Sequence, residues 1–122
     1  MSEHLGPFLD LSCVIITLNE ERRLAACLGS LPKGAEVIVL DSGSTDATRE
    51  IAKKAGARVE QRTFTNHAEQ KNAAMALATR RWILSIDADE VLDPVLCRNI
   101  EQTVRLETTP LRGYRLTRRL WF

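Results

Sequence analysis

The sequence lacks the features that mark disulfide-rich, membrane-spanning or nucleic-acid-binding proteins. Its three cysteines are odd in number, form no Cys-x-x-Cys pair and have no histidine partner at zinc-site spacing, which predicts reduced thiols in a cytoplasmic protein. The longest apolar runs are far too short to span a bilayer, and no basic segment followed by a long apolar one marks the N-terminus. A net charge of +1 gives no electrostatic case for nucleic acid.

Internal repeats, low-complexity tracts and linkers rich in Pro, Gly or Ser are also missing, so the 122 residues fit one domain. With 44% hydrophobic residues the chain can bury a core, although only 5% are aromatic. We expect residues 1–10 to be a lead-in and residues 11–122 to form the domain. Its apolar runs predict strands at 12–17, 36–40, 57–62 and 82–86.

Helical patterns separate these strands. Asn19 is a favoured N-cap, and Leu24, Leu28 and Leu31 follow at helical spacing. A second helix is expected to be capped by Ser44, Thr45 or Asp46, to face inward through Ala47, Ile51 and Ala55, and to stop at Gly56. This alternation predicts an α/β fold with a doubly wound, mostly parallel sheet.

Two further helices have clear start signals. Asn66 with Glu69 fits a capping-box variant, and Asp93 before a proline fits an N-cap. The last helix is predicted to run through Val95, Ile100 and Val104, and the loosely alternating residues 111–122 predict a half-buried strand.

The most informative stretch is 82–90, where a short apolar run ends in Asp87, Asp89 and Glu90. Ligands of parallel sheets bind outside the carboxyl ends of the strands, so these acids are expected at the ligand edge. If the chain turns at Ala88, Asp87 and Asp89 can converge on Mg²⁺ or Mn²⁺, which prefer oxygen ligands.

Three other interpretations apply to these acids. They could be solvated loop residues. An EF-hand is excluded because Val91 and Leu92 occupy the positions that need an acid and a glycine. A metal-dependent phosphotransferase with Asp87 as nucleophile stays open, although such enzymes usually carry this motif on their first strand.

Other polar residues fall at the same predicted edge. Asp41 follows the second strand and could accept hydrogen bonds from a base or ribose, or cap its own loop. Lys71 could approach a phosphate or be a solvated lysine, and Asn19 and Glu20 could bind a ligand or only begin a helix. His67 has no nucleophile or metal ligand nearby in the sequence and gives no catalytic case.

Three ordered motifs resemble family 2 glycosyltransferases of the GT-A fold, a Rossmann-like nucleotide-diphospho-sugar transferase fold: residues 14–20 (Val-Ile-Ile-Thr-Leu-Asn-Glu), 37–46 (Val-Ile-Val-Leu-Asp-Ser-Gly-Ser-Thr-Asp) and 86–90 (Ile-Asp-Ala-Asp-Glu). The resemblance covers roughly residues 10 to 122. The Gln-Lys-Asn block at 70–72 and the stretch 82–90 look especially like the branch that adds glucose to the heptose of the lipopolysaccharide inner core.

This resemblance implies residue roles. It puts Thr17, Asn19 and Glu20 beside the nucleotide, Asp41 against the base, and Asp87 at the ribose and metal region. Asp89 would ligate Mg²⁺ or Mn²⁺ at the diphosphate of a sugar donor, which the resemblance implies to be a UDP-sugar, and so assist the leaving group.

The resemblance also implies an inverting transfer to a glycan or glycolipid acceptor, with an acidic catalytic base downstream of Asp89. No later motif matches that base, because Glu101 and Glu107 fit the polar face of a helix. We therefore expect a donor-binding part truncated at its C-terminus, located in the cytoplasm with peripheral contact to the inner membrane. The alternatives are a fragment that binds the nucleotide sugar without transferring it, and the phosphotransferase.

Overall fold

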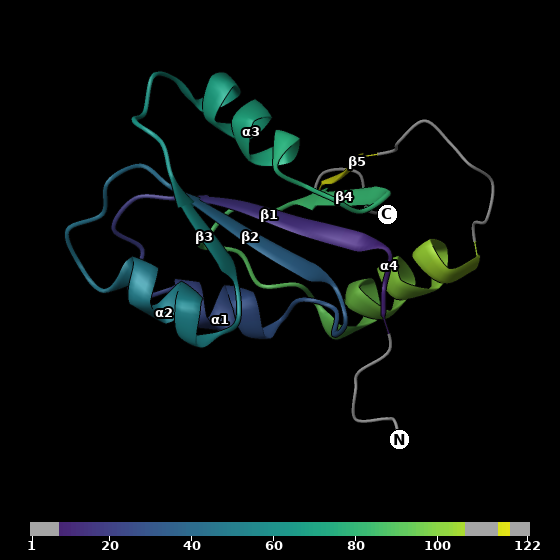
Figure 1. Ribbon diagram of the computed structural model, residues 1–122. Helices are drawn as coiled ribbons and strands as arrows, with labels where there is room; N and C mark the ends of the chain where they lie inside the picture. Colours follow the sequence, from purple (N-terminus) through teal and green to yellow (C-terminus); the bar gives the residue numbers. More distant parts are fainter. Residues whose placement is uncertain (1–7, 107–114, 118–122) are drawn as a thin grey trace.

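The computed structural model describes residues 8–106 and 115–117, and this part is an α/β sheet with helices on both faces (Figure 1). All strand pairs are parallel, in the order β3-β2-β1-β4-β5. The strands are β1 (Leu11–Thr17), β2 (Glu36–Asp41), β3 (Arg58–Gln61), β4 (Trp82–Ser85) and β5 (Arg115–Thr117). The predicted α/β class is confirmed, and so are the four predicted strands that precede β5.

The helices divide unequally between the two faces of the sheet. They are α1 (Leu24–Gly29), α2 (Thr48–Lys54), α3 (His67–Ala76) and α4 (Pro94–Leu106). Figure 1 shows α1, α2 and α4 on one face and α3 on the other. Each face has its own apolar cluster, as a doubly wound sheet requires.

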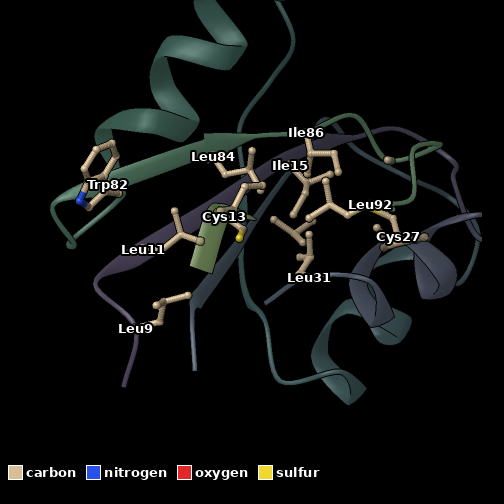
Figure 2. Packing of buried hydrophobic residues seen from close by; sticks show 14 of the residues in the cluster. Leu9, Leu11, Cys13, Ile15, Cys27, Leu31, Trp82, Leu84, Ile86 and Leu92 are labelled. Atoms are coloured by element: carbon tan, nitrogen blue, oxygen red, sulfur yellow. The ribbon is translucent and has the colours of Figure 1, made fainter. Parts of the chain in front are cut away.

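The central strand β1 supplies both clusters by simple alternation. Cys13 and Ile15 pack with residues of β4, α1 and α4, as Figure 2 shows for several of them. Val14 and Ile16 face the opposite way, toward α3. Successive side chains of a strand point to opposite faces, so a strand covered on both faces is apolar almost throughout.

The topology defines where a ligand crevice should lie. From β1 the chain continues to β2 on one side, whereas β4 lies on the other side of β1 and is followed by β5 further out. In open parallel sheets the crevice forms outside the carboxyl ends of the strands at such a switch point. Here that position lies between residues 18–23, which follow β1, and residues 86–93, which follow β4.

The predicted start of the first helix is wrong. α1 begins at Leu24, with Arg23 rather than Asn19 at the N-cap. Asn19 has a left-handed backbone (φ 53°), and its side-chain oxygen accepts a hydrogen bond from the Thr45 N–H (2.8 Å). Asn19 therefore contacts the loop that follows β2 and does not cap a helix of its own segment.

The inward stripe of α2 differs in part from the prediction, since Ile51 packs against the core as expected and Ala55 does not. Thr48 and Ala52 are buried, whereas Ala55 is exposed. The predicted cap is wrong, because α2 begins at Thr48 with Ala47 rather than Ser44, Thr45 or Asp46 at the N-cap, and the Asp46 carboxylate accepts the Thr48 N–H (2.9 Å) in the turn before the helix. The predicted stop is confirmed, since Gly56 has φ 89° and follows directly on the last turn.

The caps predicted for α3 and α4 are confirmed. The Asn66 side chain accepts the Glu69 N–H (2.9 Å), and the Asp93 side chain accepts the Val95 N–H (2.7 Å). The helix α4 runs through Val95, Ile100 and Val104 as predicted; Ile100 and Val104 are buried, whereas Val95 is 56% exposed.

Of the strand predicted at 111–122, residues 115–117 form β5, and the rest lies outside the described residues. Within the described ranges no helix is long and apolar enough to cross a membrane.

Candidate nucleotide-binding site

Two adjoining cavities open at the carboxyl edge of the sheet. The apolar cavity, of about 290 Å³, is lined by Ile16, Thr17, Leu18, Glu20, Ser42, Phe64 and His67. The acidic cavity, of about 480 Å³, is lined by Ile16, Glu20, His67, Ala68, Lys71, Asp87, Ala88 and Asp89. Since Ile16, Glu20 and His67 line both, the two cavities adjoin each other.

The chain turns after β4, as convergence of the two aspartates requires. The Glu90 N–H donates to the Asp87 carbonyl (3.0 Å), and the Glu90 side chain accepts the Asp87 N–H (3.0 Å). Ala88 is buried within this turn, and Asp87 and Asp89 both reach the acidic cavity. The sequence predicted that Asp87 and Asp89 can converge only if the chain turns at Ala88, and this turn is present.

Each of these aspartates faces a cation. Asp87 Oδ1 lies 3.5 Å from Lys71 Nζ, and Asp89 Oδ2 lies 3.3 Å from an Arg23 guanidinium nitrogen. The two carboxylates are 49% and 47% exposed. Exposed ion pairs of this kind contribute about 0–1 kcal/mol, so an incoming ligand can replace these partners at small cost.

The donor set suits a hard divalent cation that also binds a ligand phosphate. Two carboxylates line one cavity, and Mg²⁺ and Mn²⁺ are commonly held by one or two carboxylates with water and phosphate oxygens completing the shell. In residues 8–106 and 115–117, no group of three or more His, Cys, Asp or Glu side chains forms an all-protein metal site. The residues present thus fit a metal that arrives with a diphosphate.

Cys27 lies beneath the turn. Its thiol is buried and faces the Asp87 carbonyl, with the sulfur 3.6 Å from the oxygen. Burial, followed by the negative charges of Asp89, Asp87 and Glu20, raises the pKa of Cys27 to about 12. The thiol therefore stays neutral, which suits a weak donor under the turn and excludes a thiolate nucleophile.

Asp41 has the loop-capping role in this structure. Its carboxylate is fully buried and accepts hydrogen bonds from the Thr17 hydroxyl (2.7 Å), the Ser44 hydroxyl (2.6 Å), the Ser44 N–H (2.7 Å) and the Gly43 N–H (2.9 Å). Burial opposes ionisation, but these hydrogen bonds outweigh it and lower the pKa of Asp41. Asp41 lines neither cavity, so a direct contact with a base stays a prediction.

Of the residues predicted to bind a nucleotide or metal, five line the cavities: Thr17, Glu20, Lys71, Asp87 and Asp89. Asn19, like Asp41, lines neither. It joins the loop after β1 to the loop after β2, because its N–H also donates to the Ser44 hydroxyl oxygen (2.8 Å).

Sequence reasoning missed Ser42, Phe64 and His67. The rings of Phe64 and His67 lie edge to face, with centroids 5.3 Å apart, and both line the apolar cavity. An exposed aromatic residue three positions before a histidine, in a chain poor in aromatics, was the available signal. The sequence gives His67 no partner for nucleophilic catalysis or metal binding, but in the structure its ring forms part of the cavity wall.

An α/β sheet with such a crevice at its switch point is the architecture of a nucleotide-binding protein. Residues 12–105 match the family described as Glycosyl transferase family 2, and the chain belongs to this family. It is 37% identical over 118 residues to the "Lipopolysaccharide core biosynthesis glycosyltransferase LpsC" of Rhizobium meliloti, covering 93% of this chain and 43% of the relative. An uncharacterized glycosyltransferase of Rickettsia conorii is 44% identical over 92 residues, which are 75% of this chain and 33% of that protein.

Solved structures show the same fold. Glucosyl-3-phosphoglycerate synthase from Mycobacterium tuberculosis, in complex with Mn²⁺, UDP and phosphoglyceric acid, superposes with a TM-score of 0.66 at 26% identity. The match covers 82% of this chain and 40% of the synthase. The chain thus spans about a third to two fifths of the length of these relatives.

Proposed function

We propose that residues 11–122 form the donor-binding part of an inverting glycosyltransferase that uses a UDP-sugar and Mg²⁺ or Mn²⁺. The observation that carries the proposal is the pair of adjoining cavities, one apolar and walled by two rings, the other lined by Lys71, Asp87 and Asp89. A nucleoside diphosphate has the matching polarity, with a flat base at one end and a diphosphate at the other.

In the proposed complex the base enters the apolar cavity against Phe64 and His67. Stacking on aromatic side chains suits any base and contributes about 1–3 kcal/mol per base. Glu20 lines both cavities, so it is the candidate acceptor for ribose hydroxyls. Thr17 and Asn19 serve the nucleotide indirectly, because they fix the two loops that wall the cavity.

At the acidic end, Asp89 is the proposed metal ligand, with Asp87 beside it facing the ribose and metal region. The metal, when bound with the diphosphate, would neutralise charge on the departing nucleoside diphosphate. Lys71, now 3.5 Å from Asp87, is within reach of a phosphate oxygen once the metal shares that carboxylate. Arg23 holds Asp89 in a comparable way from the other wall.

The acceptor and pathway are proposed from the relatives. The Rhizobium meliloti relative is a glycosyltransferase of lipopolysaccharide core biosynthesis, and the Mycobacterium tuberculosis synthase binds UDP and Mn²⁺ in its crystal structure. We therefore propose a glycan or glycolipid acceptor in lipopolysaccharide or cell-envelope synthesis. A cytoplasmic location, with peripheral membrane contact, and a catalytic base downstream of Asp89 remain predictions from the sequence.

Calorimetric titration of UDP, with and without Mn²⁺, tests the donor site. We expect Mn²⁺-dependent binding by the folded chain and at least a tenfold loss in Asp89→Ala. Asp93→Asn is the matched control, because it removes a nearby acid while an asparagine still caps α4. A folded chain that does not bind UDP, or an Asp89→Ala variant that binds as well as wild type, contradicts the proposal.

Lys71→Met separates the phosphate role from the aspartate pair. We expect weaker UDP binding, by about tenfold at low salt, with Mn²⁺ still required. Unchanged affinity would mean that Lys71 is only a partner of Asp87.

Two alternatives are distinguished by chemistry rather than binding. Incubation with UDP-sugar and acceptor yields a glycosylated product only from a transferase, whereas donor binding without product supports a binding fragment. Beryllofluoride trapping at Asp87 would instead support the phosphotransferase.

A further inference from the structure

The last turn of α1 contacts the turn that carries Asp87 and Asp89. The buried Cys27 thiol faces the Asp87 carbonyl, with the sulfur 3.6 Å from the oxygen, and the Leu92 N–H donates to the Ser30 hydroxyl oxygen (2.9 Å). We propose that Cys27 and Ser30 are positioning residues, which hold this turn in the shape that lets both aspartates reach one divalent cation. The inference rests on the proposed function and names residues on which its metal site would depend without their touching the metal.

These contacts come from one face of α1. From the N-cap to the C-cap, Arg23, Cys27 and Ser30 are spaced at i, i+4 and i+7, which places them in a row along the helix. The Arg23 guanidinium lies 3.3 Å from Asp89 Oδ2, so each member of the row meets the segment after β4 at a different point. Leu92 and Cys27 also belong to the same apolar cluster and lie close together in Figure 2. The helix therefore supports that segment along its length.

Ser30 has the hydrogen-bond direction that this role requires. Its hydroxyl donates to the Cys27 carbonyl (2.7 Å), so the proton is committed within α1 and the oxygen accepts the Leu92 N–H. The Ser30 N–H also donates to the Cys27 carbonyl (3.1 Å), so this carbonyl keeps a partner if the hydroxyl is removed. Loss of the hydroxyl therefore releases the turn and leaves the end of α1 hydrogen-bonded.

The backbone of the turn is held more firmly than its carboxylates. The Asp87 N–H donates to the Glu90 side chain, and the Asp87 carbonyl accepts the Glu90 N–H and faces the Cys27 thiol. The Asp87 and Asp89 carboxylates, by contrast, are half exposed and make ion pairs of small energy. Metal binding would thus exchange the partners of the side chains while the backbone stays in place.

The effect expected from Ser30 follows from this arrangement. Two carboxylates repel each other until a cation joins them, so the chain itself must keep them close before the metal binds. Residues that orient metal ligands in this way commonly contribute about 10–100-fold to metal affinity. Ser30 holds one end of the turn while Cys27 and Glu90 hold the other, which favours the lower end of that range.

The test measures the calorimetric affinity of the folded chain for UDP over a series of Mn²⁺ concentrations. The Mn²⁺ midpoint, at which the gain in UDP affinity is half complete, is expected to rise about tenfold in Ser30→Ala, because only part of the population then has the turn in its binding shape. At saturating Mn²⁺ the affinity for UDP should return to within about twofold of wild type. Ser30→Thr keeps the hydroxyl, and Ser30 borders a cavity of about 750 Å³ between α1 and α4 that gives the added methyl room, so this variant should restore the wild-type midpoint.

Two controls separate positioning from a general loss of stability. Thr103→Ala removes a hydroxyl that likewise donates to a helix carbonyl (Asn99, 2.9 Å), but on an exposed face of α4. Gly56→Ala is expected to destabilise the chain through its positive φ just before β3, at the edge of the sheet opposite the site. Both variants should keep the wild-type Mn²⁺ midpoint. An equal rise in Gly56→Ala and Ser30→Ala would show that lost stability is the cause and would overturn the proposal.

Hydrogen exchange followed by NMR tests the same contact without a metal. The Leu92 amide should exchange at least about tenfold faster in metal-free Ser30→Ala than in wild type, and at the wild-type rate in Ser30→Thr. Cys27 supplies an independent pair, because Cys27→Ser keeps a donor toward the Asp87 carbonyl and Cys27→Ala does not. The Mn²⁺ midpoint should be at least about threefold higher in Cys27→Ala than in Cys27→Ser. If Ser30→Ala does not fold, this pair decides.

The outcomes separate this inference from the proposed function. If wild type binds UDP with Mn²⁺ but Ser30→Ala keeps the wild-type midpoint, the positioning role is overturned and the donor site stands. Faster exchange at Leu92 with an unchanged midpoint would overturn it too, because the contact would then be structural only. If the folded chain binds no UDP in the presence of Mn²⁺, the proposed function is overturned and this inference with it.

Discussion

Replacement of Asp41 by asparagine tests whether this buried carboxylate organises the ligand edge of the sheet. Asp41 accepts four hydrogen bonds from Thr17, Gly43 and Ser44, and Arg49 approaches it at 3.3 Å. An asparagine can keep its oxygen toward the Gly43 and Ser44 N–H groups, but its amide nitrogen then replaces the charged acceptor of the Thr17 and Ser44 hydroxyls. Loss of two charge-assisted hydrogen bonds at about 1.5–3 kcal/mol each predicts a decrease of about 3–6 kcal/mol in the free energy of unfolding.

The assay is urea unfolding at pH 7, followed by far-ultraviolet circular dichroism. The matched control is Glu60→Gln on the neighbouring strand β3, whose carboxylate is 44% exposed and pairs with Arg58. That surface pair should contribute no more than about 1 kcal/mol. The reasoning is refuted if Asp41→Asn unfolds within about 1 kcal/mol of wild type, or if the two variants lose equal stability.

The same substitution predicts a change in pH dependence. The pKa of Asp41 is lowered in the folded state, so on acidification the unfolded chain binds this proton first. Its stabilisation is present above the unfolded value of about 3.9 and is lost as the pH falls through the folded value. Wild type should therefore lose more stability than Asp41→Asn between pH 6 and pH 3. Equal losses would mean that Asp41 is not the group responsible.

Three smaller predictions follow from the same structure. Asn66→Ala should lower the free energy of unfolding by about 1 kcal/mol, because α3 loses its N-cap, and urea unfolding measures it. Gly56→Ala should cost about 1 kcal/mol or more from its positive φ alone, since an added Cβ would meet nothing within 4 Å; an unchanged midpoint would contradict this. At pH 8 iodoacetamide should alkylate the half-buried Cys97 first, and Cys13 and Cys27, whose pKa values burial raises, only on unfolding; mass spectrometry of peptides gives the order.

The strands were predictable because each is marked by local composition. β1 reads as one apolar run since the sheet is covered on both faces, and β4 is the same kind of segment. The caps of α3 and α4 were predictable for a similar reason, because Asn66 and Asp93 bond to N–H groups only two or three residues ahead. Local rules succeed where the partner lies within one turn of the chain.

Site residues that directly follow a strand could be predicted from the sequence. Site residues whose positions depend on the shape of a loop could not. Asp87 and Asp89 reach the acidic cavity because they follow a strand whose carboxyl end faces the crevice. Phe64 and His67 meet across the link between β3 and α3, and no period in the sequence brings their rings together. The hydrogen bond from the Gln70 amide to the Ser42 hydroxyl joins residues 28 positions apart, and no local pattern in the sequence links them.

The start of α1 was predicted wrongly for a physical reason that also concerns the candidate site. Asn19, Glu20 and Glu21 have the composition of a helix start, but their hydrogen bonds cross to the loop after β2. The Glu20 N–H donates to the Thr48 hydroxyl (2.8 Å), and the Glu21 carboxylate accepts the Ala47 N–H (3.1 Å). The hydrogen bonds that the sequence predicted within one helix thus connect two different segments of the chain.

This exchange fixes the two loops to each other before any ligand arrives. A site whose walls are already hydrogen-bonded loses less conformational entropy on binding than one that must order its loops. Ser42 lies in one of these loops and Glu20 in the other, and both line the apolar cavity. The separation of Ser42 and Glu20 across the apolar cavity is therefore set by the fold, which favours a ligand of one shape over a range of ligands.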